Sequence, residues 1–123
     1  MAMAADLSVK SGWMLKKGEK RTNWSRRWFV LDHAGMLRYY ESAEEGAELK
    51  GEIKLAAAAG CTEIRPSTHP KAEPAEIEIA CTERTYRFRP DNTESQAGWF
   101  RGFSSTGLLS SLASRPDVEE LTR

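Results

Sequence analysis

The sequence predicts a mainly β fold that ends in one α-helix, with seven short antiparallel strands curled into a partly open barrel of two near-orthogonal sheets. Two observations predict it. Seven short segments between residues 10 and 89 alternate apolar and polar residues or are rich in strand-forming side chains. Residues 93–103 then combine a helix start signal with an apolar face at helical spacing. The helix is expected to cap one end of the barrel and to leave the other end open.

The first three strands are predicted to form a meander. Aromatic and β-branched residues concentrate in the second strand, around Trp28 and Phe29. A polar loop that begins at Gly18 and a short turn that contains Gly35 separate the strands. The three predicted strands span residues 10–17, 25–31 and 36–41.

The next four strands show alternation more clearly. Ile53 and Leu55 alternate with charged residues in the fourth strand, and Ile77 and Ile79 do so in the sixth. Such alternation places one face on the core and the other in water. Residues 56–59 are too few for an α-helix and are interpreted as a turn. The four predicted strands span residues 50–55, 61–65, 76–81 and 85–89.

The helix is predicted to begin at Thr93, because Thr93 and Gln96 have the T-x-x-Q spacing of a reciprocal cap. Trp99, Phe100 and Phe103 form one apolar face, which we assign to the core. Glycines weaken this helix by roughly 1 kcal/mol each relative to Ala. Its stability must therefore come from docking the aromatic side chains on the sheet.

Length and composition fit one globular domain. The chain has 123 residues, of which 40% are hydrophobic and 29% are charged. We expect a flexible N-terminus over residues 1–9, a domain over residues 10–113 and a flexible tail over residues 114–123. Cys61 and Cys81 have no CxxC spacing and no secretory leader before them, which favours a reducing, cytoplasmic compartment and small apolar roles.

Charge is distributed unevenly, although the formal net charge is zero. Residues 10–38 hold eight basic residues against two acidic ones, whereas residues 39–123 hold ten against fifteen. A basic face on an otherwise acidic protein favours an anionic surface met in one orientation, rather than indiscriminate binding of nucleic acid. We therefore expect a monomer that contacts membranes reversibly and does not bind nucleic acid.

The segment from Gly12 to Leu31 carries the candidate binding site. Read with a period of two, Met14 and Lys16 share one face of the first strand, and Arg27 and Phe29 share one face of the second. A basic side chain in a core-facing row is costly unless it lies at an open end. Lys16 and Arg27 are therefore predicted to lie at the mouth of the barrel and to bind phosphate.

Taken together, these motifs resemble a pleckstrin homology (PH) domain over about residues 10–113. The matching segments are, in order, GWMLKKG, WSRRWFVL, LRYYE, LKGEIKL and RTYRFRP, followed by Trp99 and Phe103. The resemblance implies a module that binds phosphoinositide headgroups and targets a larger signalling or trafficking protein to membranes. We expect no enzymatic activity and no cofactor.

The resemblance further implies a basic pattern across the first two strands. Lys16 matches its first Lys and Arg27 matches its final Arg, whereas Ser25 occupies the middle basic position. Tyr39 and Lys50 match positions that touch inositol phosphates in PH domains that recognise 3-phosphorylated lipids.

The loop between these strands is expected to contribute as well. Lys20 and Arg21 are predicted to attract phosphate, and Trp24 and Lys17 to contact the membrane. Two plainer interpretations stay open. The cations could pair with acids such as Glu19, and Trp24 could pack under its loop.

A second function hypothesis is a protein-interaction module that takes a peptide along a sheet edge or between a strand and the helix. Ser25, in place of a basic residue, favours this hypothesis. Catalysis has little support, because His33 lies in a turn and His69 lies between prolines, without the spacing of a triad or a metal site.

Overall fold

The computed structural model describes residues 8–19 and 23–106. Within them, all seven predicted strands and the predicted helix are present. The elements are β1 (Ser8–Lys17), β2 (Trp24–Asp32), β3 (Met36–Tyr40), β4 (Leu49–Lys54), η1 (Ala57–Ala59), β5 (Cys61–Pro66), β6 (Ile77–Cys81), β7 (Thr85–Arg89) and α2 (Thr93–Ser105). Strand β1 begins two residues before its predicted start, so Ser8 and Val9 belong to the sheet rather than to a flexible N-terminus.

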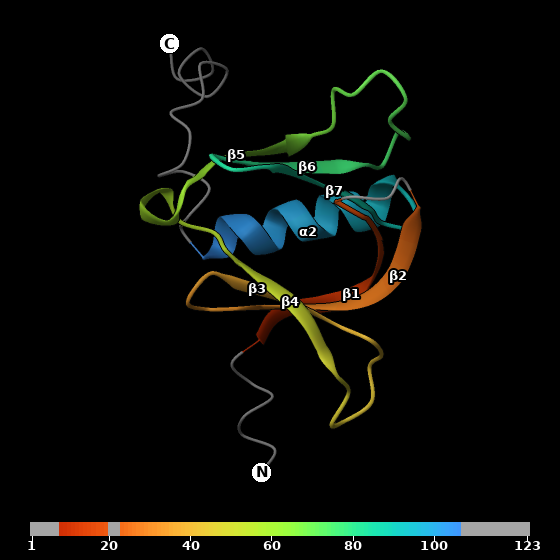
Figure 1. Cartoon of the computed structure of the whole chain (residues 1–123), viewed down its shortest axis with the longest axis vertical. Coiled ribbons are helices and arrows are strands. Elements are labelled where there is room, and N and C mark those ends of the chain that lie inside the picture. The colour runs from red at the N-terminus through yellow and green to blue at the C-terminus, as the bar shows by residue number, and fades with distance from the viewer. Residues whose placement is uncertain (1–7, 20–22, 107–123) are drawn as a thin grey trace.

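The strands form one antiparallel sheet in the order β4-β3-β2-β1-β7-β6-β5, which bends into two layers (Figure 1). One layer contains β1 to β4 and the other contains β5 to β7. The layers are joined where β1 pairs with β7, at Leu15 with Arg89 and at Lys16 with Phe88. Strands β4 and β5 lie at opposite edges, so the sheet does not close. The predicted partly open barrel is confirmed, and its two sheets are continuous through β1 and β7.

The core lies between the two layers and includes the apolar face of α2. Phe29 and Phe88 come from different layers, are both 0% exposed, and meet edge to face with ring centroids 4.9 Å apart. Trp99 and Phe103 of α2 belong to the same buried cluster, with Phe100 partly buried against it. The predicted core role of this aromatic face is confirmed, and α2 binds the two layers together.

The helix α2 begins at Thr93 as predicted, but its cap differs from the prediction. Asn92, not Thr93, is the N-cap, and its side-chain oxygen accepts a hydrogen bond of 2.8 Å from the backbone N–H of Ser95. Gln96 does not cap the helix. Its side-chain amide donates to the backbone carbonyl of Glu76 at 3.1 Å, which connects α2 to the chain just before β6.

Gly102 has a packing role in α2 that offsets its low helix propensity. A Cβ at this position would lie 3.1 Å from the Cβ of Lys10 on β1. The glycine therefore permits a close approach of the helix to the strand.

Residues 57–59 lie within the predicted turn and form one turn of 3-10 helix, η1. Gly60 ends it with a φ of +96°, in the left-handed region that favours glycine. The Gly60 carbonyl accepts a hydrogen bond of 2.8 Å from the N–H of Thr82, so this turn is tied to the end of β6.

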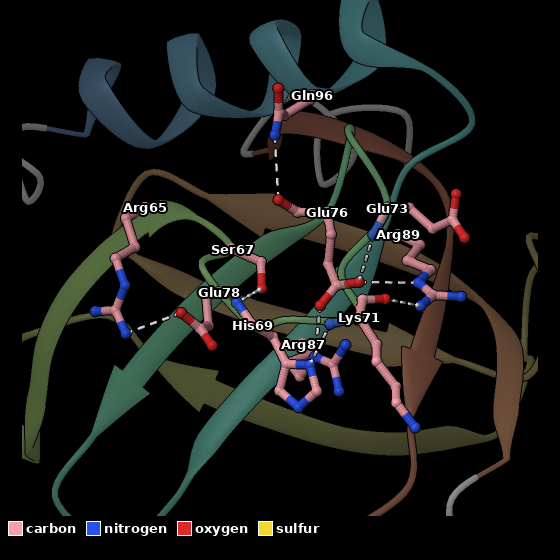
Figure 2. Close-up of polar contacts among 10 residues, drawn as sticks. All are labelled: Arg65, Ser67, His69, Lys71, Glu73, Glu76, Glu78, Arg87, Arg89 and Gln96. Carbon is pink, nitrogen blue, oxygen red and sulfur yellow. Dashed lines mark hydrogen bonds and ion pairs between the residues drawn. The ribbon is translucent and has the colours of Figure 1, made fainter.

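A buried ionic cluster that alternation did not predict lies at the start of β6 and on its outer face. Glu76 and Glu78 were expected in water but are only 1% and 7% exposed. The Glu76 carboxylate accepts hydrogen bonds from Nε of Arg87 at 2.5 Å and Nε of Arg89 at 2.9 Å (Figure 2). The N–H of Glu73 adds a third bond of 3.3 Å, because the loop before β6 folds over this face.

This cluster satisfies its own charges. Burial raises the pKa of Glu76, but the bonds from Arg87 and Arg89 outweigh it and hold the pKa below its usual value of 4.5. Glu78 forms an ion pair of 2.8 Å with Arg65. We therefore assign these buried carboxylates a structural role.

Candidate functional site

Cations occupy core-facing rows at the open end of β1 and β2. Met14 and Phe29 are 1% and 0% exposed, and Lys16 and Arg27 are the next inward residues toward the β1–β2 loop. Met14 pairs with Arg27 across the ladder, and Lys16 pairs with Ser25. The predicted sharing of faces is confirmed, and the two cations lie diagonally across adjacent strands.

Lys16 is a partly buried cation in a positive environment. Its Nζ lies 5.1 Å from the centroid of the Tyr39 ring. Desolvation lowers the pKa of Lys16, and the charges of Arg84 and Arg27 lower it further, against an opposing effect of Glu19. An anion bound beside the Lys16 ammonium would therefore offset its repulsion from Arg84 and Arg27.

Arg84 is the third cation of this cluster, and no local sequence pattern predicts it. It lies in the turn between β6 and β7, and its guanidinium carbon is 4.1 Å from the centroid of the Tyr86 ring. Its Nη1 forms an ion pair of 3.0 Å with Glu19, and its Nε is buried without a hydrogen-bond partner. The antiparallel pairing of β1 and β7 brings this turn to the end that holds Lys16.

Tyr39 forms an apolar wall of the site. Its ring packs against Phe29, with centroids 5.3 Å apart, and pairs across the ladder with Gly51 of β4. Desolvation raises the pKa of the Tyr39 phenol, whereas the charges of Arg84 and Arg27 act in the opposite direction. Tyr39 is thus within electrostatic range of the same cations as Lys16.

A cavity of about 770 Å³ opens beside this cluster. Glu19, Arg84 and Tyr86 line it together with residues of β4, η1 and the end of β6. The arrangement offers donors from Lys16, Arg27 and Arg84, and the acids Glu19, Glu52 and Glu83 line the cavity as well. Such a set of donors can bind phosphate groups through charge-assisted hydrogen bonds.

Lys50, a predicted ligand residue, lies among acids. Its Nζ is 3.6 Å from Glu41 and 3.9 Å from Glu48. It is also the extra residue of a bulge, because Tyr39 pairs with Gly51 and Tyr40 pairs with Leu49. The structure therefore does not place Lys50 in the group formed by Lys16, Arg27 and Arg84.

The remaining predicted residues lie around the β1–β2 loop. Trp24 is partly buried, with its ring centroid 3.9 Å from the guanidinium carbon of Arg89 and 5.3 Å from that of Arg87. Lys17, at the end of β1, is partly buried too. Lys20 and Arg21 lie outside the described residues.

The described part of the chain offers no metal centre, since it contains no group of three His, Cys, Asp or Glu residues that could hold an ion. His33 and His69 are exposed. Within residues 8–19 and 23–106, no helix has the length and apolarity needed to cross a bilayer.

Known proteins resemble this chain in both sequence and fold. Mouse Switch-associated protein 70 is 34% identical over 112 residues, which are 91% of this chain and 18% of that protein. Pleckstrin homology domain-containing protein 1 of Arabidopsis thaliana is 26% identical over 73% of this chain and 62% of its own length. The chain thus spans less than a fifth of the Switch-associated protein that it matches.

Two solved structures share the fold. The C-terminal PH domain of pleckstrin in complex with D-myo-Ins(1,2,3,4,5)P5 has a TM-score of 0.64 and 24% identity, over 80% of this chain and 97% of that one. The PH domain of Slm1 in complex with phosphoserine has a TM-score of 0.66 and 19% identity, over 85% of this chain and 98% of that one. The family model of the PH domain matches residues 8–107. Since that match covers the whole seven-stranded sheet and the closing helix, the chain belongs to the PH domain family.

Proposed function

We propose that this domain binds phosphoinositide headgroups and thereby recruits a larger protein to membranes reversibly from the cytoplasm. One observation carries the proposal. Lys16, Arg27 and Arg84 come from three separate segments to one open end of the sheet, where Glu19 pairs with Arg84.

The chemistry of the site fits a defined phosphate group better than a diffuse negative surface. A basic residue near an anionic leaflet contributes about 1 kcal/mol, so three of them give about 3 kcal/mol, which corresponds to weak affinity. A hydrogen bond to a charged group contributes about 1.5 to 3 kcal/mol, and each of the three cations can donate at least one. The fold shared with the inositol-phosphate complex of pleckstrin accords with this assignment.

Neighbouring residues would strengthen the contact with a membrane. We assign Lys17, Trp24, Lys20 and Arg21 to this surface. Lys50 can join the site once a phosphate replaces its contacts with Glu41 and Glu48.

Vesicle sedimentation tests the proposal. Wild-type protein should pellet with phosphoinositide vesicles, and Arg27→Ala should lose about tenfold or more in affinity, as expected for one charge-assisted bond. Arg101→Ala is the matched control, because Arg101 is exposed on α2. Equal binding by the wild type and Arg27→Ala would refute the site.

A protein-interaction module is the second candidate. Ser25 opposite Lys16 and the acid contacts of Lys50 favour it, because both reduce the positive charge available to a lipid. Capture of a defined partner by a protein that gives only background vesicle binding would support this candidate instead.

A further inference from the structure

The two cysteines, twenty positions apart in sequence, lie directly opposite each other in the sheet. Cys61 begins β5 and Cys81 ends β6, and their Cα atoms are register partners in the antiparallel ladder. Both thiols are free. Cys61 belongs to the buried core and Cys81 packs against it, and neither thiol belongs to the group of cations at the anion site.

The backbone pairing around the two cysteines is of the type that accepts a cross-strand disulfide, with a register shift in β5 immediately after Cys61. The N–H of Cys61 donates to Ala56 and the N–H of Cys81 donates to Arg84, so neither bonds to the opposite cysteine. The adjacent Gly60 and Thr82 do share a bond of 2.8 Å, which makes the cysteines a non-hydrogen-bonded pair. In such pairs the Cα atoms lie about 4.5 Å apart, within the range of about 4.4 to 6.8 Å for disulfides.

The two thiols are close enough to influence each other's pKa. Their access to solvent differs. Cys61 is 0% exposed, whereas Cys81 is partly exposed and lines the cavity that also contains Arg84. A reagent in that cavity can therefore reach Cys81 first.

We propose that Cys61 and Cys81 form a redox-active thiol pair, which a low-molecular-weight disulfide such as oxidised glutathione converts into an intramolecular cross-strand disulfide. The proposal goes beyond headgroup binding and does not depend on it.

The exchange proceeds in two steps. The Cys81 thiolate attacks one sulfur of oxidised glutathione, which forms a mixed disulfide and releases one glutathione thiolate. The Cys61 thiol then loses its proton to solvent and attacks the Cys81 sulfur, which releases the second glutathione. Two protein thiols are oxidised to one disulfide, and one glutathione disulfide is reduced to two thiols.

The raised pKa values of the two thiols favour the disulfide at equilibrium. Burial raises the pKa of Cys61 to about 12 and raises the pKa of Cys81 as well, with the Arg84 charge acting in the opposite direction on Cys81. The reduced form therefore gains little stabilisation as thiolate, unlike the low-pKa thiols of strongly oxidising proteins. Exchange is expected to be slow, and faster in mildly alkaline buffer.

The proposed bond lies at the base of the turn that carries Arg84, since the Cys81 N–H donates to the Arg84 carbonyl at 2.9 Å. A disulfide there would fix the end of β6 to β5. The disulfide would thus form next to the anion site.

Thiol counting in glutathione redox buffers tests the proposal on the folded chain. Wild-type protein in oxidising buffer should lose both thiols, gain no glutathione and show a mass lower by two hydrogens. Cys61→Ala should end as a glutathione adduct on Cys81, and Cys81→Ala should keep its buried thiol. Amide spectra of each variant establish that it is folded.

Two outcomes would overturn the proposal. One is a wild-type protein that stops at the glutathione adduct. The other is a wild-type protein that keeps both thiols after prolonged equilibration in oxidising buffer. Neither outcome bears on headgroup binding, which the vesicle assay measures separately.

Discussion

The ring and hydroxyl of Tyr39 occupy the space that any side chain at position 51 would fill. Gly51 is the ladder partner of Tyr39, and a Cβ built on it would lie inside contact distance of the hydroxyl oxygen and two ring atoms of Tyr39. The glycine is therefore what allows Tyr39 to lie across β4 while its ring remains beside the ammonium of Lys16.

Gly51→Ala should displace Tyr39. We expect a loss of about 1 to 3 kcal/mol in the free energy of unfolding, as for other overpacked sites. Weaker headgroup binding should accompany it, because the wall beside Lys16 moves. Chemical denaturation and calorimetric titration with a soluble inositol phosphate measure the two effects.

The Tyr39→Ala background supplies the control. If the clash is the cause, Gly51→Ala should have little effect on stability once the ring is absent, and the double-mutant cycle should give a large coupling energy. Additive effects of the two substitutions would contradict this explanation.

Arg84 and Glu19 are predicted to have opposite effects on headgroup affinity. Arg84→Ala should lower it about tenfold or more, since a charge-assisted donor is lost. Glu19→Gln should raise it about two- to fivefold, because an exposed ion pair is worth up to about 1 kcal/mol and no longer competes for Arg84. Calorimetric titration of both variants checks the signs, and a decrease for Glu19→Gln would rule out competition.

Glu76 is predicted to make the domain sensitive to acid. Its pKa in the folded state lies below its usual value of 4.5, so its stabilising effect is present above that value and is lost as the pH falls through the folded-state pKa. Glu76→Gln should lower stability by about 3 kcal/mol near neutral pH, because Arg87 and Arg89 lose their buried partner.

Unfolding free energies measured over a range of acidic pH test this prediction. The wild-type curve should fall more steeply than that of Glu76→Gln, whereas Glu44→Gln, at an exposed position, should follow the wild type. Parallel curves for the wild type and Glu76→Gln would show that the ionised carboxylate is not the stabilising form.

The helix cap gives a direct comparison between two neighbouring residues. Asn92→Ala should cost about 1 kcal/mol, because the bond to the Ser95 N–H is lost. Thr93→Ala should cost much less, since Thr93 is exposed and is not the N-cap. Thermal unfolding of the two variants compares these losses. A larger loss for Thr93→Ala would show that Thr93 is the N-cap, as the T-x-x-Q spacing predicted.

Local periodicity predicted much of this molecule correctly. Alternation located the strands, and it placed Lys16 and Arg27 at the ends of core-facing rows because side-chain direction in a strand depends only on parity. The aromatic spacing in α2 predicted its buried face for a similar reason.

Features that depend on contacts between distant segments could not be predicted from local sequence patterns. Arg84 joins the site through the pairing of β1 with β7, which no local pattern specifies. Glu76 is buried because the loop before β6 folds over an outer strand face, so alternation alone placed it in water. The cap was predicted at Thr93 instead of Asn92, because the T-x-x-Q motif that begins one residue later is also a helix start signal.

The junction between the two layers has a mechanical consequence. Among the described residues, backbone pairing crosses from one layer to the other at Leu15 with Arg89 and at Lys16 with Phe88. Sliding of the layers past each other is therefore resisted mainly by interlocked side chains, above all the helix aromatics. Under a pulling force we expect the two layers to separate first at the β1–β7 junction, while the hydrogen-bonded ladders within each layer remain intact.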